Sequence, residues 1–489
     1  MSFAISVGSA RGRRTAGVLI AALFLGLLSF VGTTSLVPLV ATGHSVDDVA
    51  RAVRSVGGVV TASIGLVDGV VARVPSERVE ELARIVEVAA DRTLRVRSAS
   101  FSSAPESAFP YEVGAVDSWA HTAGEGIGVA LVDTGVAPVP DLIDRIVAVA
   151  DLTAEKAPLD TFGHGTFMAG LIAGDGSSSE GRYVGVAPGA NLISVKVAVS
   201  DGSTTLGTVL AGLQLVHGAR SIFNVRVVLL ALSSPSAYSP DRDPLTKALR
   251  KLWADGIFVV VPAGNDGPEA GSVDSPGFDP VLMTAGAVDD RGTPSVSDDV
   301  ATEWTSRGPT PWGAAKPDVA APGAHLVSLR APGSTIDKEN PNAVVDEAYF
   351  RGSGTSMSAA VTAGVAALVL SSEPNLTPDQ LKDRLIGDAT PLAGASSSAV
   401  GSGVVRASVN GPGTVPPSGG GTLVERGPGL GNWSGFLWNG RIWDGRIWDG
   451  RIWDGRIWDG RIWDGRVWDG RVWDGRVWDG RIWNSRLWG

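Results

Sequence analysis

Five short apolar runs in the middle of this 489-residue chain constrain its fold more than any other feature. They predict strands at residues 129–132, 192–197, 225–230, 258–261 and 281–287. Amphipathic stretches between or after them predict helices at residues 206–219, 245–254 and 358–370. Strands that alternate with helices favour a parallel sheet covered on both faces. We therefore expect an α/β domain of three layers between residues 108 and 410.

Composition excludes several classes of function. The net charge of -10 argues against nucleic acid as a partner, because attraction to phosphates needs a basic face. The chain has no cysteine, which excludes disulfides, a cysteine nucleophile and thiolate metal sites. A hydrophobic content of 44% with 19% charged residues is typical of a globular protein.

The N-terminus carries an export signal. Arg11, Arg13 and Arg14 precede an apolar run at residues 16–31, the pattern of a secretory signal peptide. An uncleaved membrane anchor is the alternative, because apolar residues resume at 36–41 and no clean cleavage site follows the run. We assign residues 1–43 to a signal peptide or anchor, which places the protein outside the cytoplasm, secreted or at the cell surface.

Residues 44–97 predict a small α+β unit. Ser45 can cap a helix that ends at Gly57 and Gly58, and strands are expected at residues 59–64 and 67–74. Pro75 and Ser76 open a second helix, which a third strand follows. The polar stretch after this unit, up to residue 107, is interpreted as a linker to the main domain.

The C-terminal part has a different character. Thr377 begins a last helix with a capping box, and residues 411–431 form a Gly/Pro-rich linker. Within residues 432–489 a tryptophan recurs every five residues, mostly as Arg-Ile/Val-Trp-Asp-Gly. Asp-Gly favours turns, and arginine can stack on tryptophan. Two interpretations stay open, an array that binds cell-wall glycan or another cell surface, and a disordered low-complexity tail.

Four motifs carry the chemistry of a peptide-bond hydrolase. Asp133 ends a predicted strand, and His164 lies between glycines in Phe-Gly-His-Gly-Thr. Ser356 opens a helix of small residues after a Gly-rich turn, and Asn265 follows another strand in Ala-Gly-Asn-Asp-Gly. Nucleophile, base, orienting carboxylate and oxyanion donor are the groups that such hydrolysis needs. Each motif alone has a structural alternative, such as a turn or a helix cap.

Together, in the order Asp, His, Asn, Ser, these motifs resemble the subtilisin-like (subtilase) serine proteases. Further landmarks of the resemblance lie at residues 185–190 and 316–323. The resemblance implies a subtilisin-like three-layer fold and an endopeptidase that cleaves protein or peptide substrates. It assigns catalytic roles to Asp133, His164 and Ser356, and the oxyanion hole to Asn265 with the Ser356 amide. It also implies substrate binding by Leu232, Ser233 and Gly264.

The chain departs from the family pattern at two positions. Ala360 stands where the family usually has a proline, and Ser233 stands where a glycine lets a substrate strand pair closely. The family implies no required cofactor. Structural calcium is compatible with the resemblance, but the sequence presents no clear calcium loop, so no ligands are assigned.

Residues 44–97 resemble the inhibitor-type propeptide of the same family. The implied role is to assist folding and block the active site until self-cleavage near residues 97–107. A permanently attached adaptor domain is the alternative. For the whole chain, a surface-binding protein on a protease scaffold is disfavoured by the four intact motifs. An esterase is disfavoured because no Gly-x-Ser-x-Gly surrounds Ser356.

Overall fold

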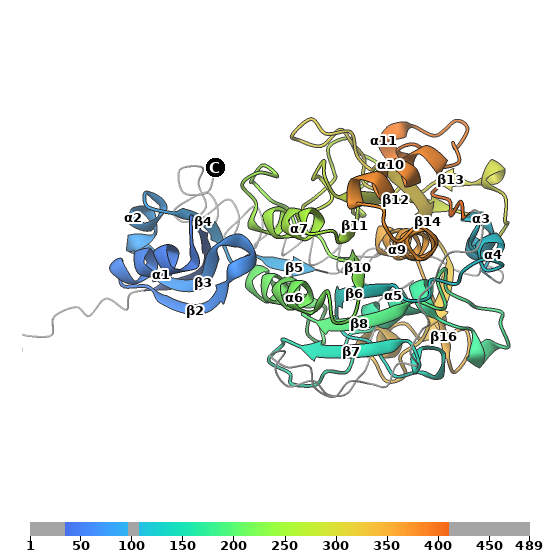
Figure 1. Cartoon of the computed structure of the whole chain (residues 1–489), viewed down its shortest axis with the longest axis horizontal. Coiled ribbons are helices and arrows are strands. Elements are labelled where there is room, and N and C mark those ends of the chain that lie inside the picture. Colours follow the sequence, from blue (N-terminus) through green and yellow to red (C-terminus); the bar gives the residue numbers. More distant parts are fainter. Residues whose placement is uncertain (1–34, 96–106, 410–489) are drawn as a thin grey trace, which may run out of the picture.

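The structure, a computed structural model, describes residues 35–95 and 107–409, which form two units (Figure 1). The signal segment up to residue 34, the linker at 411–431 and the tryptophan repeats lie outside the described residues. The smaller unit is N-terminal and lies beside helices α6 and α7 of the larger one (Figure 1).

The N-terminal unit is a four-stranded antiparallel sheet with two helices. Its strand order is β2-β3-β1-β4. The elements are β1 (Leu36–Thr42), α1 (Val46–Ser55), β2 (Val59–Ile64), β3 (Gly69–Pro75), α2 (Val79–Ala83) and β4 (Glu87–Ala90). Ser45 caps α1 by accepting a hydrogen bond from the Asp48 amide at 3.2 Å, as predicted. Val49 and Val53 of α1 are fully buried against the sheet.

The start of this unit corrects one expectation. Residues 36–41 were assigned with the signal or anchor, but they form β1, which pairs with both β3 and β4. Leu39, Val40 and Ala41 have no exposed surface, so the apolar run is explained by burial inside a sheet. The unit therefore begins at Leu36 and not at residue 44. Hydropathy alone could not separate this strand from the apolar segment before it, because a buried strand and the end of an anchor have the same composition.

The larger unit is built on a mainly parallel sheet of order β13-β12-β11-β10-β6-β8-β7, with β14 also paired to β12. Only the short β13 runs antiparallel to its neighbour among these described strands. All five predicted strands are present. The strands are β6 (Gly128–Asp133), β7 (Ile146–Asp151), β8 (Asn191–Lys196), β10 (Val225–Leu229), β11 (Phe258–Pro262), β12 (Met283–Asp289), β13 (Val300–Ala301) and β14 (Val319–Pro322).

Helices cover both faces of this sheet. Figure 1 shows α6 (Leu206–Ala219) and α7 (Pro244–Ala254) on one face, and α5 (His164–Ala173) and α9 (Thr355–Ser372) on the other. Helix α9 is long and apolar enough to cross a membrane, but 94% of it is buried inside the protein, so it is a core helix. The predicted capping box of Thr377 and Gln380 opens α10 (Pro378–Asp388).

Shorter elements complete the described chain. They are β5 (Thr93–Arg95), α3 (Phe109–Glu112), α4 (Ala115–Ser118), β9 (Ser203–Thr205), β15 (Leu326–Leu329), α8 (Thr335–Glu339), β16 (Tyr349–Gly352) and α11 (Ser397–Val400). Strand β5 leaves the N-terminal unit and pairs antiparallel with β9, so the small unit contributes a strand to the large one (Figure 1).

Candidate active site

The candidate catalytic residues lie where strands end and helices begin. Asp133 is the last residue of β6, and Asn265 comes three residues after the end of β11. His164 is the first residue of α5 and Ser356 the second of α9, two helices that pack against each other. Because the carboxyl ends of parallel strands meet at one edge of the sheet, residues far apart in the sequence converge there.

Asp133 and His164 form a buried pair. The two carboxylate oxygens lie 2.9 and 2.7 Å from Nδ1 of the ring, and both side chains are at most 1% exposed. Oδ1 of Asp133 also accepts the Thr134 amide at 2.7 Å. Since a carboxylate only accepts, Nδ1 must carry the proton, which leaves Nε2 as the basic nitrogen.

The backbone around His164 is held by Asp160, which lies outside the four motifs. Asp160 accepts hydrogen bonds from the amides of Phe162 and Gly163, just before α5, and from the amide of Thr166 in its first turn. Asp160 lies three residues before Gly163, the N-cap of α5, so the usual capping signal does not identify it in the sequence. The carboxylate fixes the first turn of α5 and so the place of the imidazole.

Position 165, directly after His164, has room only for glycine. A Cβ atom at Gly165 would lie 2.0 Å from the carbonyl oxygen of Gly135, two residues beyond Asp133. The Gly165 amide also donates to the Thr134 hydroxyl at 3.0 Å. The absence of a side chain at Gly165 therefore lets α5 approach the end of β6 closely.

Ser356 lies in the first turn of α9. Its hydroxyl donates to the carbonyl oxygen of Ala231 at 3.3 Å, and the side chain is 1% exposed. The Gly-rich turn before it is tied to the landmark at residues 316–323, because the Gly354 amide donates to the Gly323 carbonyl at 2.7 Å. The amide groups of a first helical turn have no acceptor within the helix, so they are suited to bind an anion.

Asn265 is oriented by Thr355. Its Oδ1 accepts both the Thr355 amide and the Thr355 hydroxyl, each at 2.9 Å. The same hydroxyl accepts the Gly264 amide at 3.2 Å. With Oδ1 fixed in this way, the Nδ2 group is buried and has no hydrogen-bond partner among the described residues. A buried amide donor without a partner is costly, unless it serves a ligand.

The predicted substrate-binding residues lie next to these groups. Leu232 and Ser233 follow β10, one and two residues after Ala231, and are 1% and 2% exposed. The Leu232 side chain belongs to the hydrophobic core, so only its backbone is available to a substrate. Gly264 adopts a φ of 109°, a conformation that favours glycine, and shares Thr355 with Asn265.

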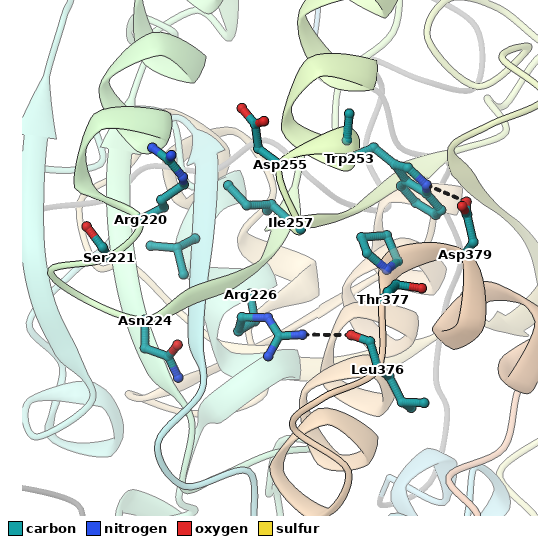
Figure 2. Close-up of a pocket in the computed structure, with 14 residues that line it drawn as sticks. Arg220, Ser221, Asn224, Arg226, Trp253, Asp255, Ile257, Leu376, Thr377 and Asp379 are labelled. Carbon is teal, nitrogen blue, oxygen red and sulfur yellow. Dashed lines mark hydrogen bonds between the residues drawn. The ribbon is translucent and has the colours of Figure 1, made fainter.

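A separate cavity of about 540 Å³ lies at the other edge of the sheet (Figure 2). Its lining includes Val225, the first residue of β10, and Ile257, which precedes β11. Polar groups in its wall bond to one another, such as Trp253 Nε1 to Asp379 at 2.8 Å. The cavity is at the amino ends of the strands and so is not part of the candidate active site.

The end of the N-terminal unit is anchored close to Ser356. Asp91 accepts the Gly207 amide at 2.7 Å, in the first turn of α6, and the Arg92 guanidinium lies 2.8 Å from the buried Asp243 carboxylate. The Thr93 carbonyl accepts the Ser234 hydroxyl at 3.3 Å. Residue 234 is three positions from Ala231, which contacts Ser356.

A buried Asp–His pair and a serine at the start of a helix lie at the carboxyl ends of a parallel sheet. This arrangement is typical of serine hydrolases that use an Asp-His-Ser triad. Residues 124–403 match the model of the subtilase family. The chain belongs to this family of serine proteases.

Relatives and solved structures agree with this family. The chain is 41% identical to serine protease AprX of Bacillus subtilis (strain 168) over 296 residues, 59% of this chain and 67% of AprX. It is 32% identical to Subtilisin Savinase of Lederbergia lenta over 284 residues, 58% of this chain and 90% of that protein. The structure is also similar to fervidolysin of Fervidobacterium pennivorans, with a TM-score of 0.61 at 22% identity, covering 77% of this chain and 61% of fervidolysin. This last likeness concerns the fold alone.

Proposed function

We propose that this chain is a secreted serine endopeptidase, in which Ser356 attacks the scissile carbonyl and His164 accepts its proton. Asp133 holds the imidazole with its proton on Nδ1, so that Nε2 can act as the base. The observation that carries this assignment is the buried Asp133–His164 pair. A buried donor on Asn265, which has no partner among the described residues, supports it.

The reaction follows from these groups. Attack of the Ser356 oxygen on the carbonyl carbon forms a tetrahedral intermediate, and its negative oxygen is stabilised by Asn265 Nδ2 and the Ser356 amide. His164 then gives its proton to the leaving amine, and the C–N bond breaks to leave an acyl-enzyme. A water molecule, deprotonated by His164, hydrolyses the ester and restores Ser356.

The N-terminal unit is proposed to be an inhibitor that occupies the substrate strand position. Strand β5 adds to β9 in antiparallel register, the way in which an extended peptide adds to the edge of a sheet. Asp91 and Arg92 hold this strand in place through α6 and through Asp243. A strand that is bound in this way excludes other peptides from the same edge.

The position of self-cleavage can be narrowed. The Thr93 carbonyl lies at Ser234, and Ser356 lies at Ala231, three residues away. An extended chain rises about 3.3 Å per residue, so a bond roughly three to five residues after Thr93 would reach the nucleophile. This estimate favours the beginning of the expected interval, residues 97–107.

The substrate is proposed to be an extended protein or peptide segment that pairs with β9 and with residues 231–233. Export rests on the basic and apolar pattern of residues 1–31. For the tryptophan repeats, binding of a cell-surface glycan remains a prediction from sequence.

The test compares the full precursor with its Ser356→Ala variant. We expect the wild-type protein to cleave peptides and to lose its N-terminal unit, and the variant to do neither. The measurements are peptide hydrolysis and the N-terminal sequence of the purified product. Normal maturation of the purified variant would contradict self-cleavage and favour a different processing enzyme. Undiminished peptide hydrolysis by the variant would contradict the assignment of Ser356 itself.

A further inference from the structure

The N-terminal unit places one charged side chain inside the peptidase unit. Nη2 of Arg92 donates to both carboxylate oxygens of Asp243, at 3.1 and 2.8 Å, and to the Ser275 hydroxyl at 3.2 Å. The Asp243 side chain has no exposed surface, and that of Arg92 is 11% exposed. Removal of one partner from such a pair leaves the other charge without its counterion.

The acceptor of this ion pair is held by the peptidase unit alone. Asp243 is the N-cap of α7, where Oδ1 accepts the Leu245 amide at 2.9 Å. Oδ2 accepts the Ser275 hydroxyl, also at 2.9 Å. Within the described part of the chain, the one ion pair of Asp243 is that with Arg92. Loss of the N-terminal unit therefore leaves a fixed carboxylate that can accept another cation.

The backbone of Arg92 extends the strand position that substrates are proposed to take. Thr93 is opposite Thr205 in the ladder of β5 and β9, and the Arg92 carbonyl accepts the Leu206 amide at 3.0 Å. A peptide that pairs with β9 in the same register places one residue opposite Thr205. The residue before it then lies beside Asp243, as Arg92 does.

We propose that Asp243 and Ser275 form a subsite for a basic side chain of the substrate, which Arg92 occupies in the precursor. This inference rests on the proposed function, because it requires substrates to pair with β9 as β5 does. A guanidinium is always charged and presents several donors in a planar fork that matches a carboxylate. The subsite therefore favours arginine, then lysine, over a neutral or acidic residue.

The subsite lies several residues before the bond that is cut. Because this bond was placed roughly three to five residues after Thr93, Arg92 precedes it by about four to six residues. A peptide that begins after the position of Arg92 can still pair with β9 but cannot reach Asp243. Short and long peptides therefore separate the subsite from the catalytic residues.

The N-terminal unit covers the surroundings of the subsite. It lies against α7 (Figure 1), and Lys247 of that helix pairs with Glu87 of β4. Tyr238, in the loop before α7, is 8% exposed and packs in the hydrophobic cluster of the N-terminal unit. Release of the unit uncovers this face, so that Asp243 becomes accessible to peptides. If the ion pair only anchored the N-terminal unit, substrates would show no preference at this position.

The test measures kcat/KM of the matured protein on matched peptides. One carries the sequence of residues 90–101 between a fluorophore and a quencher, and the other has glutamine in place of the arginine of position 92. We expect kcat/KM to be about tenfold lower for the glutamine peptide, as for the loss of a charged hydrogen-bond partner. A short peptide of residues 94–101 is the reference for each protein.

Two variants assign the preference to one carboxylate. Asp243→Asn should reduce the tenfold preference to less than about twofold, while the helix cap is kept, because asparagine is as good an N-cap as aspartate. Asp241→Asn is the matched control. The side chain of Asp241 is 81% exposed and pairs with Arg250, so the variant should keep the full preference.

The outcomes distinguish the subsite from the proposed function. Equal kcat/KM of the wild type for the two long peptides would overturn the subsite, as would a tenfold preference that persists in Asp243→Asn. If the wild type did not cleave even the short peptide, the proposed function would be contradicted and the subsite would fall with it. If Asp243→Asn does not fold, the wild-type order of arginine, lysine and glutamine peptides decides the outcome.

Discussion

Asp133 and Glu112 are both carboxylates with almost no exposed surface, yet the protein treats them in opposite ways. The oxygens of Asp133 accept hydrogen bonds from the His164 ring and from the Thr134 amide. The oxygens of Glu112 are buried and face another carboxyl group, that of Asp299, instead of an imidazole or an amide. Burial is thus the same at the two sites, and the supply of donors differs.

The supply of hydrogen-bond donors decides what each carboxyl group can do. Donors around Asp133 keep it an acceptor, which is the condition for fixing the tautomer of His164. Around Glu112, burial and neighbouring carboxylates raise the pKa, so that the group favours its protonated form. The first site is completed by donors of the chain, whereas at the second the partner of Glu112 is another carboxyl group, that of Asp299.

The largest effect on catalysis is expected when the charge of Asp133 is removed. In Asp133→Asn the side chain can donate to Nδ1 of His164, which places the imidazole proton on Nε2 and prevents it from acting as a base. We expect kcat for peptide hydrolysis to fall by about 10⁴, the size known for this kind of change in triad proteases. Steady-state kinetics on a small peptide measures the effect.

Asp117→Asn, an exposed carboxylate on α4, is the matched control and should keep wild-type kcat. A decrease of less than tenfold in Asp133→Asn would show that the carboxylate is not needed to orient the histidine. The hydrogen bonds that surround Asp133, and that Glu112 lacks, would then have no role in catalysis.

The next largest effect concerns Asn265, where an amide donor is buried without a partner. Asn265→Ala should lower kcat by roughly 10²–10³ with little change in KM, as for loss of one oxyanion donor. Because Oδ1 also accepts from Thr355, the alanine variant removes a support of the α9 turn as well.

Asn265→Asp separates these two roles. It keeps an oxygen for Thr355 but replaces the donor by a negative oxygen, so activity should fall at least as far as in the alanine variant. Thermal unfolding should be less affected than in Asn265→Ala, since Thr355 keeps its acceptor. Near-wild-type kcat in both variants would identify Asn265 as a turn residue only.

Sequence patterns predicted the fold where one rule dominated. Helix α6 was predicted at residues 206–219, its bounds in the structure, from its pattern of apolar residues. Strand β14 was not predicted, since its four residues end in a proline and carry little periodicity. Strand β1 was misassigned because its pairing with β3 and β4 is a tertiary property.

In the candidate site, too, some residues could be predicted from the sequence and others could not. Asp133, His164, Ser356 and Asn265 were identified by motif, and the structure brings them to one edge of the sheet. Asp160 and Thr355 were missed, because a residue that holds another in place has no chemistry of its own to recognise. The pairing of Glu112 with Asp299 was out of reach, since the two residues are far apart in the sequence and share no motif.

The smallest effect is expected at Glu112, and it concerns how stability depends on pH. Glu112 and Asp299 have raised pKa values in the folded state and ordinary values near 4 in the unfolded chain. Their stability contribution is therefore fully present below about pH 4 and is lost as pH rises towards the folded pKa values. Each unit of pKa difference corresponds to about 1.4 kcal/mol of the free energy of unfolding.

Replacement of Glu112 by glutamine removes this dependence, because a neutral amide can donate to Asp299 at every pH. Between pH 5 and 9 in EDTA, Tm of the wild-type chain should fall more steeply than Tm of Glu112→Gln, by a few degrees across the range. Some slope will remain in the variant, since the pKa of Asp290 is also raised, to about 6. Asp117→Asn should follow the wild-type slope. Parallel slopes for the wild type and Glu112→Gln would mean that Glu112 titrates like an exposed carboxylate, and that the two buried sites do not differ as the structure indicates.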